Sequence, residues 1–163
     1  MKRSAVILAA VCALFPASCR KAGPSLYTIG YLQLLESPTN SEVRNGFLSA
    51  LEDAGLRDGV NIRLRMANGL GDVAAVQKHA QEFVDEKVDM IVAVSTPGLQ
   101  AALMATRTIP IVFTSVANPY LTRAGTSPTE HLANVTGIAS TAPIRQGLEL
   151  IRTQRRCEQM LIN

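Results

Sequence analysis

The sequence predicts an α/β fold, a doubly wound parallel sheet with helices on both faces. From residue 26 onward, segments with the two-residue period of strands alternate with segments that have the 3.6-residue period of helices. Two strand segments, residues 89–95 and 109–116, are almost uninterrupted apolar runs, as is typical of strands that are buried on both faces. The 163 residues, 47% of them hydrophobic, are enough to bury one core, so we expect one globular domain.

Two further strands are predicted in the first half of the chain. Residues 26–33 are rich in β-branched and aromatic side chains, and the strand ends near Gln33. Residues 60–67 alternate apolar side chains with arginines. Such alternation indicates one solvated face, so we expect this strand near the edge of the sheet.

Two amphipathic helices are predicted around the second of these strands. The first covers residues 40–55, with a cap between Thr39 and Ser41 and with Gly55 as terminator. The second covers residues 72–87 and is capped by Asp72. Their apolar faces consist of Val43, Phe47, Leu51 and Ala54 in the first helix and of Val73, Val76, Ala80 and Phe83 in the second.

The second half of the chain continues the alternation. We predict a helix over residues 97–107, a loop with a short helical turn over 117–134 and a short strand over 135–140. A last helix is predicted from Thr141 or Pro143, and the apolar residues 159–163 resemble the start of another strand.

The N-terminus has the build of a secretory signal peptide over residues 1–18. A positive start precedes an apolar stretch, and small residues precede Cys19. A small-small-Cys ending resembles the bacterial lipoprotein box, in which the cysteine is lipidated, although Pro16 departs from it and ordinary cleavage near Ser18 stays open. We therefore expect an exported protein, periplasmic or at the cell surface, anchored to the membrane through Cys19, with residues 19–25 as a tether.

Composition argues against several other classes. The net charge of +3 includes two residues of the signal, and the remaining basic residues are scattered, so we expect no nucleic-acid partner. Cys157 is the one cysteine beyond the signal and Cys19, which leaves no disulfide within the mature chain. His79 lies on a predicted helix between Lys78 and Gln81, which indicates a solvated side chain. His131 has Glu130 beside it but no further ligand near it in the sequence, so we expect no metal site.

Three strand-to-helix junctions carry the candidate binding residues. Ser95 and Thr96 follow the central apolar strand and precede Pro97, which suits a helix cap and equally an anion site at a helix N-terminus. Asn118 precedes a proline after the next buried strand. The first junction offers Gln33, Glu36 and Ser37. In a parallel sheet such loops face one crevice, and together they would suit the carboxylate and ammonium of an amino acid.

Enzymatic motifs are weak or absent in the sequence. Residues 69–74, "GLGDVA", match the dinucleotide pattern only out of context, because no ribose-binding acid follows the next strand. The chain has neither a phosphate-binding loop nor a nucleophile elbow. We therefore expect no enzyme and no cofactor.

With these junctions in view, the chain resembles the ABC-transporter substrate-binding proteins that take up amino acids such as tryptophan or tyrosine. The matching segments, in order, are "YTIGYLQLLESP", "GFLSALEDAGLRDGVNIRLRMANGLGD", "DMIVAVSTPGLQAAL", "TIPIVFTSVANP", "NVTGIAS" and "GLELI". The resemblance implies a type I periplasmic-binding-protein fold, Rossmann-like, in which two lobes close on a solute and a membrane permease receives it. It also implies that the six candidate residues line the cleft, although the family commonly has Asp where this chain has Asn118.

The resemblance also implies a division of the chain. Residues 26–140 correspond to the N-terminal lobe, and residues 141–163 to the start of a truncated second lobe. Two alternatives stay open: a truncated or degenerate gene product without transport function, and a flavodoxin-like nucleotide-binding enzyme.

Overall fold

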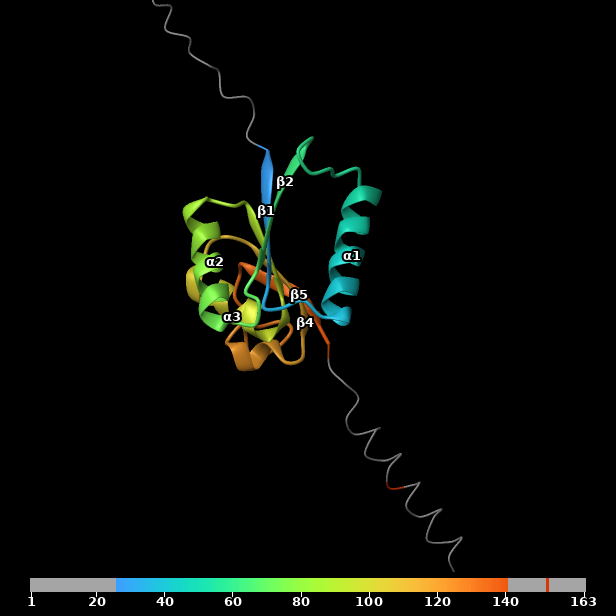
Figure 1. Cartoon of the computed structure of the whole chain (residues 1–163). Helices are drawn as coiled ribbons and strands as arrows, with labels where there is room; N and C mark the ends of the chain where they lie inside the picture. Colours follow the sequence, from blue (N-terminus) through green and yellow to red (C-terminus); the bar gives the residue numbers. More distant parts are fainter. Residues whose placement is uncertain (1–25, 141–151, 153–163) are drawn as a thin grey trace, which may run out of the picture.

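The computed structural model describes residues 26–140 and Arg152, and contains one parallel sheet of five strands (Figure 1). The strands are β1 (Tyr27–Gln33), β2 (Ile62–Asn68), β3 (Met90–Val94), β4 (Ile111–Val116) and β5 (Val135–Ala139). Their order across the sheet is β2-β1-β3-β4-β5, and every neighbouring pair is parallel. The predicted doubly wound sheet is confirmed, with the apolar strand β3 at its centre and the alternating strand β2 at one edge.

Helices cover both faces of the sheet, as predicted. The helices are α1 (Pro38–Asp53), α2 (Val73–Asp85), α3 (Ser95–Ala105) and the 3-10 turn η1 (Pro119–Thr122). Figure 1 shows α1 on one side of the sheet and α2 with α3 on the other. Because β1, β2, β3 and β4 are each followed by a crossover to another parallel strand, the connections that leave them all start at the carboxyl ends of the strands, called here the carboxyl edge of the sheet.

The two faces of the sheet differ in the size of the hydrophobic core that covers them. On the side of α2 and α3, Leu32, Ile91 and Leu99 are fully buried in the larger cluster. On the side of α1, Tyr31 is buried and its ring lies 5.3 Å from that of Phe47. Helix α1, described over its whole length, contains no fully buried residue. The α1 side therefore has the smaller core, which includes Ile62 of the edge strand β2.

Both predicted amphipathic helices form, but their starts differ from the prediction in two respects. Helix α1 begins at Pro38, and its cap is Ser37, whose hydroxyl accepts from the backbone N–H of Asn40 at 3.1 Å, so the cap predicted between Thr39 and Ser41 is wrong. The reason is Pro38, which favours the first helical position and moves the cap one residue before it. In α2, Asp72 is the cap as predicted, but Val73, which was predicted on the apolar face, is 49% exposed.

Several predicted segments lie outside the described residues. These are the signal peptide over 1–18, Cys19 with the tether over 19–25, and the helix and strand predicted after Thr141. In the part of the chain that the structure describes, no helix has the length and apolar content needed to cross a membrane.

Candidate functional site

The strand register brings the three predicted junctions to one edge of the sheet. Strand β1 lies between β2 and β3, with Leu32 opposite Ala93 and Gln33 opposite Asn68. On the other side of β3, Val94 lies opposite Thr114 of β4. The chain therefore leaves β1, β3 and β4 at neighbouring points of the carboxyl edge, the lower end of the sheet in Figure 1.

Ser95 occupies the turn from the central strand into α3, but it is not the predicted cap. The N-cap of α3 is Val94, and no side chain in the described region caps this helix. Ser95 instead adopts a left-handed backbone conformation, with φ 71°, and its Oγ is buried without a hydrogen-bond partner among the described residues. In the first turn of α3, no side chain of the described region thus accepts a hydrogen bond from the backbone N–H groups. The buried hydroxyl beside them belongs to Ser95, whose backbone is strained.

Left-handed backbone conformations gather at the same edge of the sheet. Besides Ser95, they occur at Leu70 after β2, at Ser115 near the end of β4 and at Arg123 after η1. Only Lys87 among the described non-glycine residues with positive φ lies at the opposite edge. Such conformations cost free energy and cluster where a binding site needs unusual loop shapes.

A side-chain network joins Gln33 to the start of α1. The carboxylate of Glu36 accepts hydrogen bonds from Ser41 Oγ at 2.5 Å, from Gln33 Nε2 at 2.8 Å and from Arg44 at 2.7 Å. The hydrogen bonds from Ser41 and then Gln33 hold the pKa of the Glu36 carboxyl below its ordinary value. Glu36 is thus engaged within the chain, which differs from the free ammonium acceptor expected from the sequence.

The sequence did not indicate two members of this region. Arg44 lies eight residues after Glu36 and reaches it only because α1 begins at Pro38. Tyr31, two residues before Gln33 on the same face of β1, is buried, and burial raises the pKa of its phenol to about 12. Because Tyr31 lies in a predicted apolar strand, the sequence indicated only an ordinary core residue.

Ser37 and Asn118 both act as helix caps. The Ser37 hydroxyl caps α1, and Asn118 Oδ1 accepts from the backbone N–H of Tyr120 at 3.0 Å at the start of η1. These roles account for both residues locally, so their contact with a solute stays a prediction. In residues 26–140, no group of three or more His, Cys, Asp or Glu side chains could hold a metal ion.

Comparison with known proteins identifies the family. A family model described as ABC transporter substrate binding protein matches residues 28–155 of the chain. The chain belongs to this family. The sequence-based resemblance is thereby confirmed, together with the α/β fold that it implied.

Three relatives show how far the similarity of this substrate-binding protein extends. The tyrosine-binding protein of Clostridioides difficile is 40% identical over 125 residues, which are 77% of this chain and 36% of that protein. A ligand-free, open substrate-binding protein with adhesive properties from Clostridium difficile is 37% identical, with a TM-score of 0.73. An ABC domain from Streptococcus pneumonia in complex with L-tryptophan is 26% identical, also with a TM-score of 0.73. Each structure matches 78% of this chain but only 43% of its own length, so this chain spans less than half of the relatives it matches.

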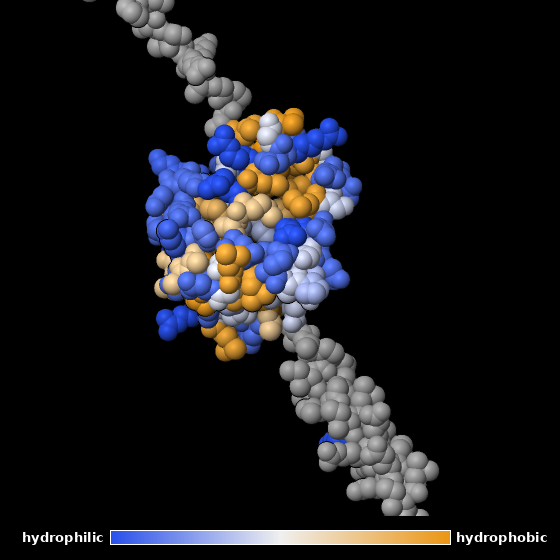
Figure 2. All heavy atoms as spheres, viewed as in Figure 1, coloured by the Kyte–Doolittle hydropathy of each residue, from blue (hydrophilic) through white to orange (hydrophobic). Residues whose placement is uncertain are grey.

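Exposed hydrophobic side chains surround the carboxyl edge of this substrate-binding protein. Leu35 and Leu70 lie in the loops after β1 and β2, and Tyr120 and Leu121 lie in η1. Leu70 is 86% exposed and Leu121 is 79% exposed, and Figure 2 shows hydrophobic residues at this lower end of the molecule. An apolar rim around polar strand ends is the usual composition of a site for a small amphipathic solute.

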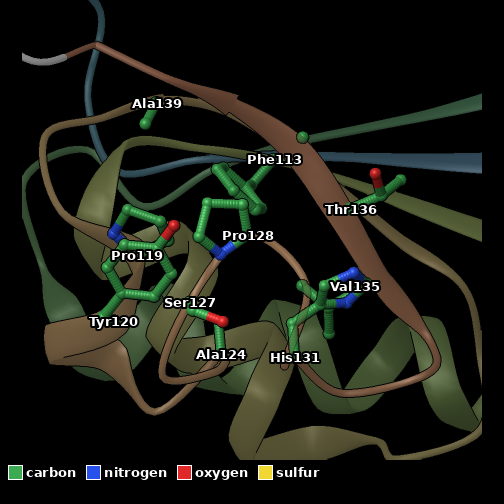
Figure 3. A pocket seen from close by; sticks show the side chains of 11 residues that line it. Phe113, Pro119, Tyr120, Ala124, Ser127, Pro128, His131, Val135, Thr136 and Ala139 are labelled. Carbon is green, nitrogen blue, oxygen red and sulfur yellow. The ribbon is translucent and has the colours of Figure 1, made fainter.

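A hollow of the substrate-binding protein lies away from the six predicted residues. It has a cavity volume of about 170 Å³ and lies between strands β4 and β5 on one side and η1 with the loop after it on the other, where Phe113, Pro128 and His131 face it (Figure 3). None of the six candidate residues lines it, and its lining contains no carboxylate, guanidinium or ammonium group. It therefore lacks the charged partners that an amino acid requires.

Proposed function

We propose that this chain provides one lobe of the solute-binding component of an ABC importer, and that the solute is an amino acid, preferably an aromatic one. The family match supports the first part. The second part rests on relatives whose names refer to tyrosine and to L-tryptophan. The protein acts by binding and carries out no reaction of its own.

The observation that carries the proposal is the start of α3. Its first-turn N–H groups have no side-chain cap among the described residues, and the hydroxyl of Ser95 is held beside them in a strained conformation. Uncapped N–H groups and the positive end of the helix dipole favour a carboxylate. We therefore assign Ser95 and Thr96 to the carboxylate of the solute, with Gln33 and Asn118 as further polar contacts.

The lobe forms one wall of the site, and the second wall belongs to a part like the one that the longer relatives contain. A small solute is usually buried over most of its surface, so tight binding requires both walls. Closure of two lobes about a hinge would enclose the solute and present a closed form to the permease. We expect the exposed hydrophobic rim, with Leu70 and Leu121, to contact the second wall.

Residues 1–25 complete the proposal as an export and anchoring segment. After cleavage at residue 18, Cys19 would carry the lipid and residues 19–25 would separate it from the lobe. Mass spectrometry of the protein expressed in a bacterial host should find a lipid-modified Cys19 as the first residue. Replacement of Cys19 by alanine should release the protein from the membrane fraction, and an unmodified mature N-terminus would argue against the anchor.

The binding proposal can be tested by NMR on the 163-residue chain. Titration with L-tyrosine, L-tryptophan and L-phenylalanine should shift the backbone amides of Ser95 and Thr96, with dissociation constants of about 1 mM, because a single lobe buries only part of the solute. Thr96→Val should weaken binding about tenfold, the factor expected for one lost hydrogen bond to a charged group.

Thr28→Val is the matched control. It makes the same change near the amino end of β1, away from the carboxyl edge, and should leave binding unchanged. If no amino acid of a broad panel shifted the amides at the carboxyl edge, the proposed function would be wrong.

A further inference from the structure

A polar pocket lies between the start of α1 and the carboxyl ends of β1 and β2. Its cavity volume is about 130 Å³, and Tyr31, Gln33, Glu36, Arg44 and Met66 are among the residues that line it. The side chains of Glu36 and Arg44 are 45% and 30% exposed, so the pocket reaches solvent on their side. It shares Gln33 with the proposed solute site and lies on the α1 face of the sheet.

Two buried oxygens at this pocket have unmet hydrogen-bonding capacity. Gln33 is 3% exposed and Tyr31 is 1% exposed, and neither Gln33 Oε1 nor Tyr31 Oη has a partner among the described residues. The orientation of the Gln33 amide is fixed, since its Nε2 donates to Glu36 at 2.8 Å and leaves Oε1 as the free acceptor. A buried polar group without a partner is costly, so two in one pocket indicate a missing binding partner.

The charges around the pocket restrict the chemistry of that partner. A carboxylate would meet the oxygens of Glu36 and Gln33, and an ammonium would meet the guanidinium of Arg44. Glu36 and Arg44 already neutralise each other at 2.7 Å, so the pocket has no net charge to offer. The partner that fits is neutral and both donates and accepts a hydrogen bond, which is the property of a hydroxyl group.

We propose that this pocket binds a hydroxyl group of the solute, with Gln33 Oε1 accepting from it and Tyr31 Oη donating to it. The proposal rests on the proposed function and narrows it to hydroxyl-bearing solutes, with Tyr31 and Gln33 as specificity-determining residues. Neither oxygen has exposed surface, so the hydroxyl enters with a small shift of the pocket lining, and the Gln33 amide keeps its hydrogen bond to Glu36.

Two further observations suit this role. A phenol is already protonated at neutral pH, and burial, which raises the pKa of Tyr31 to about 12, further disfavours its ionised form, so the hydroxyl stays a donor. The Tyr31 ring packs against Phe47 with centroids 5.3 Å apart, so the hydroxyl is held in a fixed direction. A rigid donor beside a fixed acceptor discriminates well against a solute that lacks the hydroxyl.

The first test compares L-tyrosine with L-phenylalanine, which differ by one hydroxyl, in titrations of the 163-residue chain followed by NMR. We expect tyrosine to bind about tenfold more tightly, the factor supplied by one to two neutral hydrogen bonds. Tyr31→Phe and Gln33→Met should each reduce this preference to about threefold or less. Tyr27→Phe, the same change at the exposed start of β1, should leave it unchanged.

The second test uses phenol and toluene, which carry no amino-acid groups, and follows the side-chain NH2 signals of Gln33. Phenol should shift these signals in the parent chain but not in Tyr31→Phe, and toluene should not shift them. The pocket assignment is overturned if phenol leaves the Gln33 signals unchanged, which would indicate a water site only, or if toluene shifts them equally. Equal binding of tyrosine and phenylalanine would refute this inference alone, whereas a phenol response without amino-acid binding would refute the proposed function alone.

Discussion

Replacement of Ser95 by glycine is expected to make the lobe more stable and its binding of an amino acid weaker. The left-handed conformation at Ser95, with φ 71°, costs a non-glycine residue about 1–2 kcal/mol. Its buried, unpartnered hydroxyl adds a further cost of about 1 kcal/mol. Glycine removes both costs but loses about 0.5–1 kcal/mol of backbone entropy on folding. We therefore expect the free energy of unfolding to rise by about 1 kcal/mol in urea denaturation.

The same substitution should lower the affinity for the amino acid about tenfold, because the hydroxyl proposed to contact the carboxylate is lost. Lys87→Gly is the matched control, since Lys87 is also left-handed but lies at the opposite edge of the sheet. It should relieve strain without changing affinity in the same NMR titration. A Ser95→Gly variant that is less stable, or that binds as well as the parent chain, would contradict the assignment of Ser95 as a strained binding residue.

Replacement of Phe83 by alanine is expected to cost about 3–5 kcal/mol of the free energy of unfolding. Phe83 in α2 is 2% exposed, and its ring lies directly against the backbone of β1 at Gly30. A Cβ added at Gly30 would lie only 2.5 Å from the ring, which shows how closely the ring and the strand pack. Removal of the ring therefore leaves a cavity that α2 and β1 can fill only by moving toward each other. Since domains are stabilised by about 5–15 kcal/mol, much of this reserve would be lost.

Urea denaturation followed by circular dichroism measures this loss. Val73→Ala provides the control in the same helix, because Val73 is 49% exposed and should cost less than about 1 kcal/mol. A loss below about 1 kcal/mol for Phe83→Ala would mean that α2 is not held against β1 by this ring.

The fold followed from the sequence because its signals are local. The apolar run of residues 89–95 and its abrupt change to helix formers marked a central parallel strand, and β3 takes that place. The alternation in residues 60–67 marked a strand with one solvated face, and β2 forms an edge. Asp72 was recognised as a cap, whereas the cap of α1 was displaced by Pro38, a choice between neighbouring residues that periodicity does not resolve.

The candidate site was predicted at the level of loops but not of atoms. Parallel strands end on one side of the sheet, so Gln33, Ser95 and Asn118 are expected to approach one another. The register brings the ends of β1, β3 and β4 to that side, and the approach of the three side chains stays a prediction. Their hydrogen bonds depend on side-chain directions and on partners from other elements. Ser95 was expected to cap α3, but its backbone is left-handed and its hydroxyl caps no N–H group of the helix and has no partner among the described residues.

By itself, the sequence determined the α/β class, the positions of strands and helices and the family, because each depends on short-range patterns or on residues in order. Only the tertiary structure decided the state of the polar groups at the carboxyl edge. It paired Glu36 with Arg44, left oxygens of Tyr31 and Gln33 buried without partners among the described residues, and placed them at one pocket. The physical reason is that hydrogen bonding, charge neutralisation and burial depend on distances between side chains, which are set only when β1, β2 and α1 pack together.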